Sequence, residues 1–205
     1  MQISFTGSRN MLKVGVTGNI GSGKTTVCRI FEHLGIDVYY SDEKAKQFYH
    51  DVAVKQQINN FFGESVFDAK QNVDTRKLAA RVFQNENELQ KLNHLIHPLV
   101  VNDFQKWCEC RENQNFVLFE SAIIYQCGLS HLFDKIIFVD TPVDMILHRS
   151  AQRGAIAMES VKQRLKNQQK NSDEHFSVDF IIYNDEEHSL IQNVVRIYNV
   201  LNIKQ

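Results

Sequence analysis

The sequence predicts an α/β protein built on a five-stranded, doubly wound parallel sheet, with an inserted helical lobe and a helical lid. Two observations carry this prediction. Short apolar runs alternate with helical patterns at both ends of the chain, as in folds where strand and helix follow one another. Between them, the interval 43–113 contains helical patterns and no strong strand. It is too long to be a loop, so we expect a lobe packed beside the sheet.

The five expected strands are short and rich in β-branched and aromatic residues. The central ones are continuously apolar rather than alternating, which is typical of strands covered by helices on both faces. A helix is expected at Thr25–Leu34, and a closing amphipathic helix at Glu187–Leu201. The expected strands are Leu12–Thr17, Ile36–Tyr40, Phe116–Phe119, Lys135–Val139 and Asp179–Tyr183.

Helices are expected inside the lobe at Asp51–Phe62, Arg76–Phe83 and Glu88–Cys110. Pro98 lies within the last of these, so we expect a kink or a break near His97, because proline lacks the amide that a helix interior requires.

These elements predict a single domain. We expect a leader at residues 1–10 that is poorly ordered, because the first patterned segment begins just after Met11. The expected parts are a core at 12–42, 114–143 and 177–205, the lobe at 43–113, and a basic helical lid at 144–176.

Composition excludes several classes of protein. The 205 residues carry a net charge of −1, which argues against a polycation that binds nucleic acid. No apolar run approaches the roughly 20 residues that cross a bilayer, so we expect no membrane span. The four cysteines are unevenly spaced and are interpreted as reduced thiols of a cytoplasmic protein. Zinc binding by Cys108 and Cys110 with His94 and His97 is a weak alternative, since no second cysteine pair has ligand spacing.

The strongest motif lies between the first strand and the first helix and fits G-x-x-x-x-G-K-[ST]. Its glycines allow successive amides to surround phosphate oxygens, and the following helix directs its positive end to the same place. We expect Lys24 to reach the β and γ phosphates and Thr25 to ligate Mg²⁺. Thr26 either adds a phosphate contact or caps the helix. The motif residues are Gly18, Asn19, Ile20, Gly21, Ser22, Gly23, Lys24 and Thr25.

Acidic residues follow three of the strands. Asp42 comes just after the second strand, at the sheet edge where ligands of such folds collect, and could take a proton from an attacking hydroxyl. The alternative is that Asp42 caps the helix expected to begin at Glu43. Glu120 and Asp140 follow later strands, and either could orient water on the metal ion.

Arg149 and Arg153 lie four residues apart, so they share one helical face. They could close over a triphosphate and offset its charge during transfer, or belong to a solvated face. The guanine-reading string N-K-x-D of GTPases is absent, and a mechanical ATPase would normally be larger. A small kinase that uses ATP therefore fits best.

The ordered strings of the chain resemble the dephospho-CoA kinase family, whose members are P-loop kinases. The resemblance runs from about Leu12 to Tyr198. It rests on VGVTGNIGSGKTTV, GIDVYYSDEKAK, FFG, TRKLAARVF, LIHPLV, FESAIIYQCGL, HRSAQR, QRLKNQ and DFIIYN.

The resemblance implies ATP-dependent phosphorylation of the ribose 3′-hydroxyl of dephospho-coenzyme A, the last step of coenzyme A synthesis. It implies Asp42 as the base or orienter of that hydroxyl, and Asn184 beside the adenine of ATP. It implies that Lys46, Arg76 and His97 face the coenzyme. The helices from Arg149 to Gln168 are implied to form the lid.

The chain departs from the family pattern at three places. Tyr40 stands where a second aspartate is usual, and Ile146 where a glutamine is usual. The segment Ala122–Gln126 reads A-I-I-Y-Q in place of P-L-L-F-E, which affects acceptor contacts and leaves the phosphate loop and Asp42 intact.

Two other functions stay open from the sequence. A nucleoside or nucleoside-monophosphate kinase would share the architecture and differ in the acceptor lobe. A regulatory module would bind ATP without catalysis. For the dephospho-CoA kinase interpretation we expect dephospho-coenzyme A as the small-molecule substrate, no nucleic-acid or membrane partner, and a monomer or weak homo-oligomer.

Overall fold

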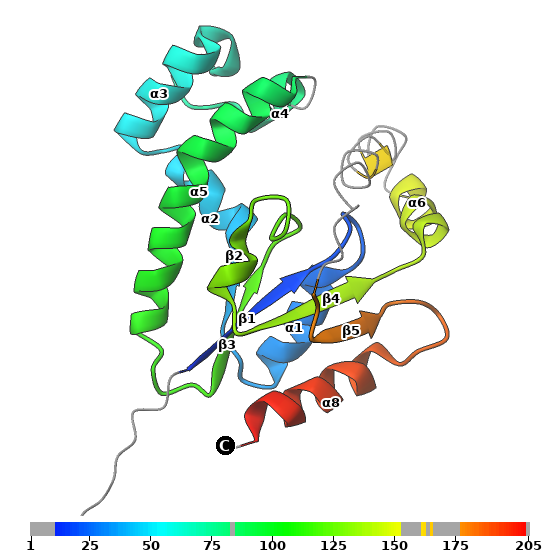
Figure 1. Ribbon diagram of the computed structural model, residues 1–205. Coiled ribbons are helices and arrows are strands. Elements are labelled where there is room, and N and C mark those ends of the chain that lie inside the picture. The colour runs from blue at the N-terminus through cyan, green and yellow to red at the C-terminus, as the bar shows by residue number, and fades with distance from the viewer. Residues whose placement is uncertain (1–10, 83–84, 153–160, 163–164, 166–176, 204–205) are drawn as a thin grey trace, which may run out of the picture. The chain divides into compact units, whose positions relative to one another are not determined.

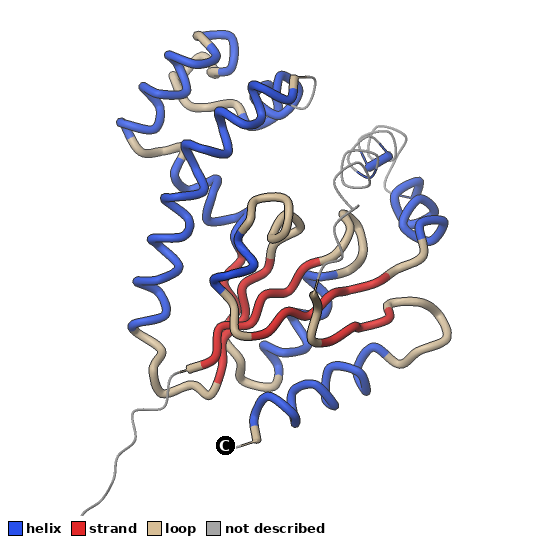
Figure 2. The backbone as a smooth tube through the Cα atoms, viewed as in Figure 1, coloured by secondary structure: helices blue, strands red, loops and turns tan. Residues whose placement is uncertain are grey.

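The computed structural model describes residues 11–82, 85–152, 161–162, 165 and 177–203. The expected leader at 1–10 and much of the expected lid, including Arg153, lie outside these residues. The chain divides into two compact units, one formed by Tyr40–Cys110 and one by the segments before and after it. Figure 1 labels the elements, and Figure 2 colours them by secondary structure.

The first unit is built on a five-stranded sheet in the order β2-β3-β1-β4-β5, shown in red in Figure 2. β1 is central and pairs in parallel with β3 and β4, so Val16 lies opposite Glu120 and Thr17 opposite Phe138. β5 adds to β4 in parallel. The predicted α/β fold with a five-stranded parallel sheet is confirmed. The strands are β1 Leu12–Thr17, β2 Val38–Tyr40, β3 Phe116–Glu120, β4 Lys135–Asp140 and β5 Phe180–Tyr183.

The apolar runs that predicted the strands form the core of this unit. Every residue of β3 is buried, as expected for a strand covered on both faces. Helix α1 (Lys24–His33) packs against β1 and β3, and its Phe31 meets the ring of Phe116 edge-on at 6.2 Å. Helix α8 (Leu190–Asn202) lies beside α1, on the same side of the sheet in Figure 1.

Helix α8 begins three residues later than predicted. Asp185 accepts hydrogen bonds from the amides of Glu187 (3.1 Å) and His188 (2.8 Å), so this stretch forms a turn. The hydroxyl of Ser189 accepts the amide of Gln192 at 3.4 Å and caps the helix.

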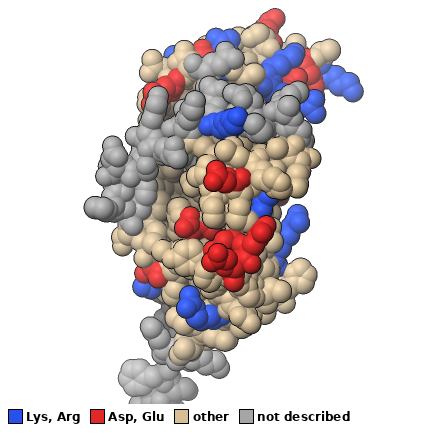
Figure 3. All heavy atoms as spheres, turned by 90° about the vertical axis from the view of Figure 1, so that its right-hand side faces the viewer, with Lys and Arg blue, Asp and Glu red and all other residues tan. Residues whose placement is uncertain are grey.

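The β5–α8 connection also carries three consecutive acids, Asp185, Glu186 and Glu187. Acidic side chains gather on the face shown in Figure 3, where this connection lies.

The second unit is helical. Its longest helix, α5 (Glu86–Glu109), contacts α2 (Ser41–Phe48), α3 (Val52–Phe62) and α4 (Thr75–Val82). A 3₁₀ turn, η1 (Glu64–Val66), follows α3. Phe83, expected at the end of α4, lies outside the described residues. The buried residues of α5 recur every fourth position and form one stripe: Leu92, Ile96, Val100, Phe104 and Cys108.

The predicted break near His97 is wrong, because α5 continues through Pro98. Proline removes one helical hydrogen bond, to the carbonyl four residues earlier. The buried stripe extends on both sides of it, with Ile96 and Val100 at 4% and 5% exposure. We infer that burial of this stripe holds the two halves in one helix, since tertiary packing outweighs a single local defect.

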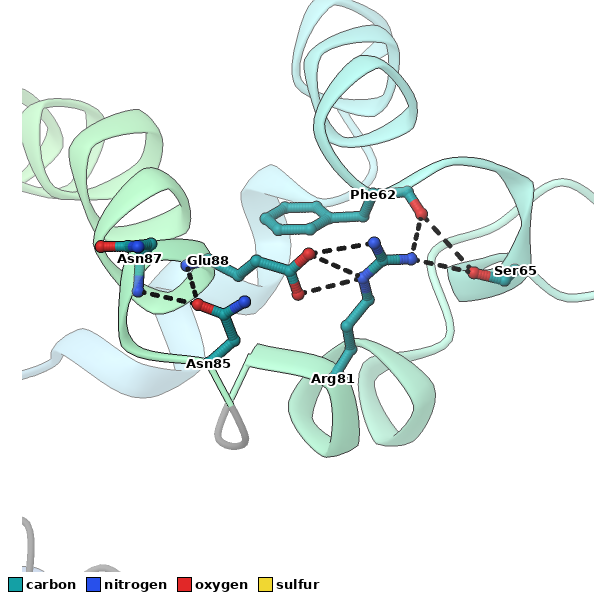
Figure 4. A network of polar contacts seen from close by, with 6 residues as sticks. All are labelled: Phe62, Ser65, Arg81, Asn85, Asn87 and Glu88. Carbon is teal, nitrogen blue, oxygen red and sulfur yellow. Dashed lines mark hydrogen bonds and ion pairs between the residues drawn. The ribbon is translucent and has the colours of Figure 1, made fainter.

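A polar network joins α3, α4 and α5 (Figure 4). The Nε of Arg81 donates to both carboxylate oxygens of Glu88, at 3.2 and 3.0 Å. Its Nη1 donates to the carbonyl of Phe62 at 2.7 Å, at the end of α3. The guanidinium also lies over the Phe62 ring, 5.9 Å from its centre. Arg81 thus satisfies a helix-end carbonyl while it pairs with α5.

Two further parts of the first unit are α6 (Val143–Gln152), which follows β4, and the 3₁₀ turn η2 (Leu129–Leu132). Within the described residues, no helix has both the length and the apolar character of a membrane span.

Candidate active site

The loop between β1 and α1 depends on its glycines. Gly18 and Gly23 have φ angles of 145° and 91°, which L-residues with side chains rarely adopt. A Cβ on Gly18 would lie 2.3 Å from the carbonyl oxygen of Val139, and one on Gly23 would lie 2.2 Å from Nδ2 of Asn184. The loop therefore requires glycine at both positions, for backbone conformation and for space.

Lys24 begins α1 and folds back over the loop. Its Nζ donates to the carbonyls of Gly18 (3.1 Å) and Asn19 (3.0 Å), and the residue is only 7% exposed. The N-cap residue Gly23 has no side chain to bond the first-turn amides of α1, while Thr25 is exposed. The first amides of a helix have no acceptor within the helix, and beside a lysine they suit a polyphosphate anion.

The carbonyl of Ser22, at the base of the loop, is held from two directions. The hydroxyl of Thr141 donates to it at 2.8 Å, and Nδ2 of Asn184 donates to it at 2.7 Å. The backbone amide of Asn184 donates to the carbonyl of Asp140 at 2.7 Å, so the ends of β4 and β5 are joined here. The structure thus brings Asn184 to the phosphate loop.

Sequence reasoning did not single out Thr141. The one available signal was a hydroxyl residue directly after β4, next to Asp140, in a fold whose strand ends gather at one edge. Ser22 presents a second unusual feature, because its own Oγ is buried and has no hydrogen-bond partner among the described residues.

Glu120 and Asp140 end the two strands on either side of β1, which leads into the loop. Glu120 is 9% exposed and Asp140 is half-buried. Burial raises the pKa of the Cys28 thiol in α1 well above its ordinary value, and the charge of Glu120 raises it further. The charge of Glu120 therefore reaches the side chain of Cys28 in α1. Neither Glu120 nor Asp140 is distinguished as the carboxylate expected to orient water on a metal ion.

Helix α6 lies against the loop. Ile146, at the position where the family pattern has glutamine, is fully buried, and its Cγ2 would lie 2.9 Å from a Cβ on Gly21. Arg149 follows three residues later on α6 and is half-buried. The apolar contact of Ile146 thus positions the helix that carries Arg149.

Asp42 belongs to the helical unit, as the second residue of α2. It is not the N-cap, because α2 begins at Ser41 and Tyr40 is the N-cap. The carboxylate is exposed. Burial raises the pKa of Tyr49, and the charge of Asp42 contributes to this rise. Lys46 is exposed one helical turn beyond Asp42, so both groups lie on one face of α2.

Two other predicted acceptor residues lie elsewhere in the helical unit. Arg76 is exposed in the first turn of α4, where Asp74 accepts its amide at 3.0 Å and caps the helix. His97 is half-buried in α5, and burial together with His94 lowers its pKa, so its neutral form is favoured. Among the described residues, no group of three or more potential ligands could hold a metal ion, so zinc binding near Cys108 finds no support.

The segment after β3, which departs from the family pattern, makes a contact of its own. The hydroxyl of Tyr125 donates to the carbonyl of Ser177 at 2.7 Å, just before β5. Burial raises the pKa of Tyr125, and the charge of Asp179 adds to this. A tyrosine here thus binds the chain that leads into the edge strand, a bond that phenylalanine would not make.

Comparison with known proteins decides the family. The family model described as dephospho-CoA kinase matches residues 12–189, which include the phosphate loop, the helical unit and Asn184. The chain belongs to the dephospho-CoA kinase family. The predicted resemblance is therefore confirmed.

Relatives and solved structures agree with this assignment. Dephospho-CoA kinase of Porphyromonas gingivalis is 33% identical over 95% of this chain and 96% of its own length. That of Bacillus licheniformis is 34% identical over 84% and 88%. A Thermus thermophilus crystal structure has a TM-score of 0.81 at 21% identity, covering 96% of this chain and all of its own. A Campylobacter jejuni dephospho-CoA kinase has a TM-score of 0.61 at 22% identity, over 95% of this chain and 99% of its own. At this identity the structures support the fold.

Proposed function

We propose that this protein transfers the γ-phosphoryl group of ATP to the ribose 3′-hydroxyl of dephospho-coenzyme A, giving coenzyme A and ADP in the last step of coenzyme A biosynthesis. The observation that carries the proposal is the family match over residues 12–189, within which the loop from Gly18 to Thr25 has the geometry of a phosphate site. The family match supports dephospho-coenzyme A as the acceptor, and the loop geometry supports ATP as the phosphoryl donor.

The loop would hold the triphosphate. Its positive-φ glycines bring backbone amides close to the anion without side chains between them, and the first turn of α1 adds further amides. Lys24, which bonds the loop carbonyls of Gly18 and Asn19, would exchange them for phosphate oxygens. Asn184 would border the adenine.

Mg²⁺ fits this site, because the exposed hydroxyl of Thr25 lies beside the loop that would carry the phosphates. When bound, the ion would neutralise charge on the β and γ phosphates. Either Asp140 or Glu120 would orient its water. Arg149, together with Arg153, would offset negative charge from the lid, which we place at residues 144–176.

The acceptor would be held by the helical lobe, which we place at residues 43–113. Asp42 would orient the 3′-hydroxyl and take its proton, so that the oxygen attacks in line with the departing ADP. Lys46 and Arg76, exposed cations, would contact phosphates of the coenzyme. His97 would hydrogen-bond as a neutral ring, since its pKa is lowered. We expect a cytoplasmic monomer or weak homo-oligomer, with no nucleic-acid or membrane partner.

The direct test measures ADP formed from ATP with and without dephospho-coenzyme A. We expect ADP release that depends on this acceptor and a product phosphorylated at the 3′ position. A parallel panel of nucleosides and nucleoside monophosphates distinguishes the kinase alternative. Tight ADP binding without acceptor-dependent turnover would instead identify a regulatory module.

Asp42→Asn tests the proposed base. The amide keeps the shape of the side chain and cannot take a proton, so we expect kcat to fall by about 10²- to 10⁴-fold. Affinity for ADP, measured by calorimetry, should not change. The matched control is Glu43→Gln, which removes the neighbouring exposed carboxylate of α2 and should leave kcat within about twofold. Near-normal turnover in Asp42→Asn would refute the assignment.

A further inference from the structure

The residue that follows β4 bonds directly to the phosphate loop, although it lies far from the loop in the sequence. Thr141 immediately follows β4 and is 2% exposed. Its hydroxyl donates to the carbonyl of Ser22 at 2.8 Å, a bond that spans 119 residues of sequence. Asn184, after β5, donates to the same oxygen at 2.7 Å. A carbonyl oxygen has two lone pairs, so these bonds use its full accepting capacity.

The two bonds determine the orientation of one peptide group. The structure contains no cis peptide among its described residues, and in a trans peptide the C=O and N–H bonds point in opposite directions. Because the Ser22 carbonyl faces Thr141 and Asn184, the amide of Gly23 faces away from both of them. Gly23 is the N-cap residue of α1, so this amide lies beside the first-turn N–H groups, which have no acceptor within the helix itself.

The geometry points to Thr141 as a positioning residue for nucleotide binding: its hydroxyl holds the Ser22–Gly23 peptide in the orientation that presents the Gly23 amide to phosphate. This inference rests on the proposed function and adds a residue to it. Thr141 itself would touch no ligand, because its hydroxyl bonds the loop carbonyl. Asn184 bonds the same carbonyl and is also proposed to border the adenine. A substitution of Asn184 would change both contacts, whereas a substitution of Thr141 changes only the bond to the loop.

Local surroundings favour a role for the bond over passive packing. Gly23 is in the left-handed region, where glycine can rotate to other conformations at little cost. The Oγ of Ser22 is buried and unpartnered among the described residues, so it does not hold the loop. Loss of one of the two bonds would leave the peptide free to populate other orientations. The apparent affinity for nucleotide then falls by the fraction of molecules that remain competent.

The test measures ADP binding by calorimetry, without acceptor, at a temperature well below thermal unfolding. Thr141→Val keeps the volume of the side chain and removes the donor. One neutral hydrogen bond corresponds to roughly a three- to tenfold change in an equilibrium constant, so we expect the Kd for ADP to rise by about that factor. Thr141→Ser keeps a hydroxyl and should restore the affinity to within about twofold of the native value. Thr141→Ala replaces the valine variant if the latter does not fold.

The matched control is Tyr198→Phe, which removes a half-buried hydroxyl in the same unit. The Tyr198 ring packs near Phe116, which begins β3, whereas the phosphate loop lies near the other end of the sheet. The Tyr198→Phe variant should leave the Kd for ADP unchanged. In the kinase assay, Thr141→Val should raise KM for ATP and leave KM for dephospho-coenzyme A unaltered.

The possible results separate the two proposals. A raised Kd for ADP in folded Thr141→Val, restored by serine, supports the positioning role. A Kd within twofold of native in the valine variant, with or without a lower Tm, overturns it and leaves the hydroxyl a structural group. If native protein binds ADP and does not phosphorylate dephospho-coenzyme A, the proposed acceptor is wrong, while the binding comparison for Thr141 still stands.

Discussion

Gly23 and Gly35 offer a controlled comparison of how the loop depends on its surroundings. Both residues have positive φ, 91° and 86°. A Cβ on Gly35, after α1, would meet nothing within 4 Å, whereas one on Gly23 would lie 2.2 Å from Nδ2 of Asn184. Substitution by alanine therefore imposes similar backbone strain at both sites and adds a collision at Gly23 alone.

The left-handed conformation costs an alanine about 1–2 kcal/mol. In a chain of this length, 1 kcal/mol lowers Tm by roughly 2–4 °C, so we expect Gly35→Ala to lower it by about 2–8 °C. Gly23→Ala should suffer the same loss and also displace the amide of Asn184 from the Ser22 carbonyl. That bond contributes about 0.5–1.5 kcal/mol, which corresponds to roughly 1–6 °C more.

The assay combines thermal unfolding by circular dichroism with ADP binding by calorimetry. Gly35→Ala should bind ADP like the native protein. Gly23→Ala should bind ADP at least about tenfold more weakly, because both the Gly23 backbone and the Asn184 side chain that holds the Ser22 carbonyl would be displaced. In an Asn184→Ala background the collision is absent, so Gly23→Ala should lower Tm only as much as Gly35→Ala does. Equal Tm losses and equal ADP affinities in the two single variants would refute the reasoning.

Two further outcomes are expected. The hydrogen bonds from Arg81 hold the pKa of the Glu88 carboxyl below its usual range, so their stabilisation is complete above the unfolded pKa of about 4.3 and is lost as pH falls through the lower folded value. Tm should consequently fall more steeply from pH 5 to 3 in native protein than in Glu88→Gln, and parallel profiles would contradict this. Burial raises the pKa of Cys127 to about 12 and that of Cys28 well above its ordinary value. Iodoacetamide at pH 8 should therefore modify exposed Cys110 first, as read by peptide mass spectrometry, and equal labelling of Cys127 would count against this.

The elements of the fold were predictable where local pattern and packing agree. Four of the five strand predictions match to within a residue at each end, because a buried parallel strand is a continuous apolar run. The second begins at Val38 rather than Ile36. Asp37, just before it, is engaged by its side chain with Arg111 at 2.7 Å, a partner far along the sequence. Strand boundaries of this kind depend on residues far away in the sequence, so the local sequence pattern does not predict them.

The helix through Pro98 shows the opposite failure. Proline is a strong local signal for a helix end, yet α5 continues. The outcome depended on the apolar stripe that α5 buries against α2, α3 and α4. A local rule states the cost of one lost hydrogen bond, and only the packed unit reveals the burial that exceeds it.

By itself, the sequence determined the phosphate loop, because its chemistry is contained in eight consecutive residues whose glycines, lysine and threonine each have a local reason. It also determined the parallel sheet, through the apolar runs that must be covered on both faces. Only the tertiary structure decided that Thr141 and Asn184 meet at the Ser22 carbonyl, across 119 and 162 residues. The physical reason is that a hydrogen bond depends on distance and direction in space, and parallel strands bring to one edge groups that the sequence leaves far apart.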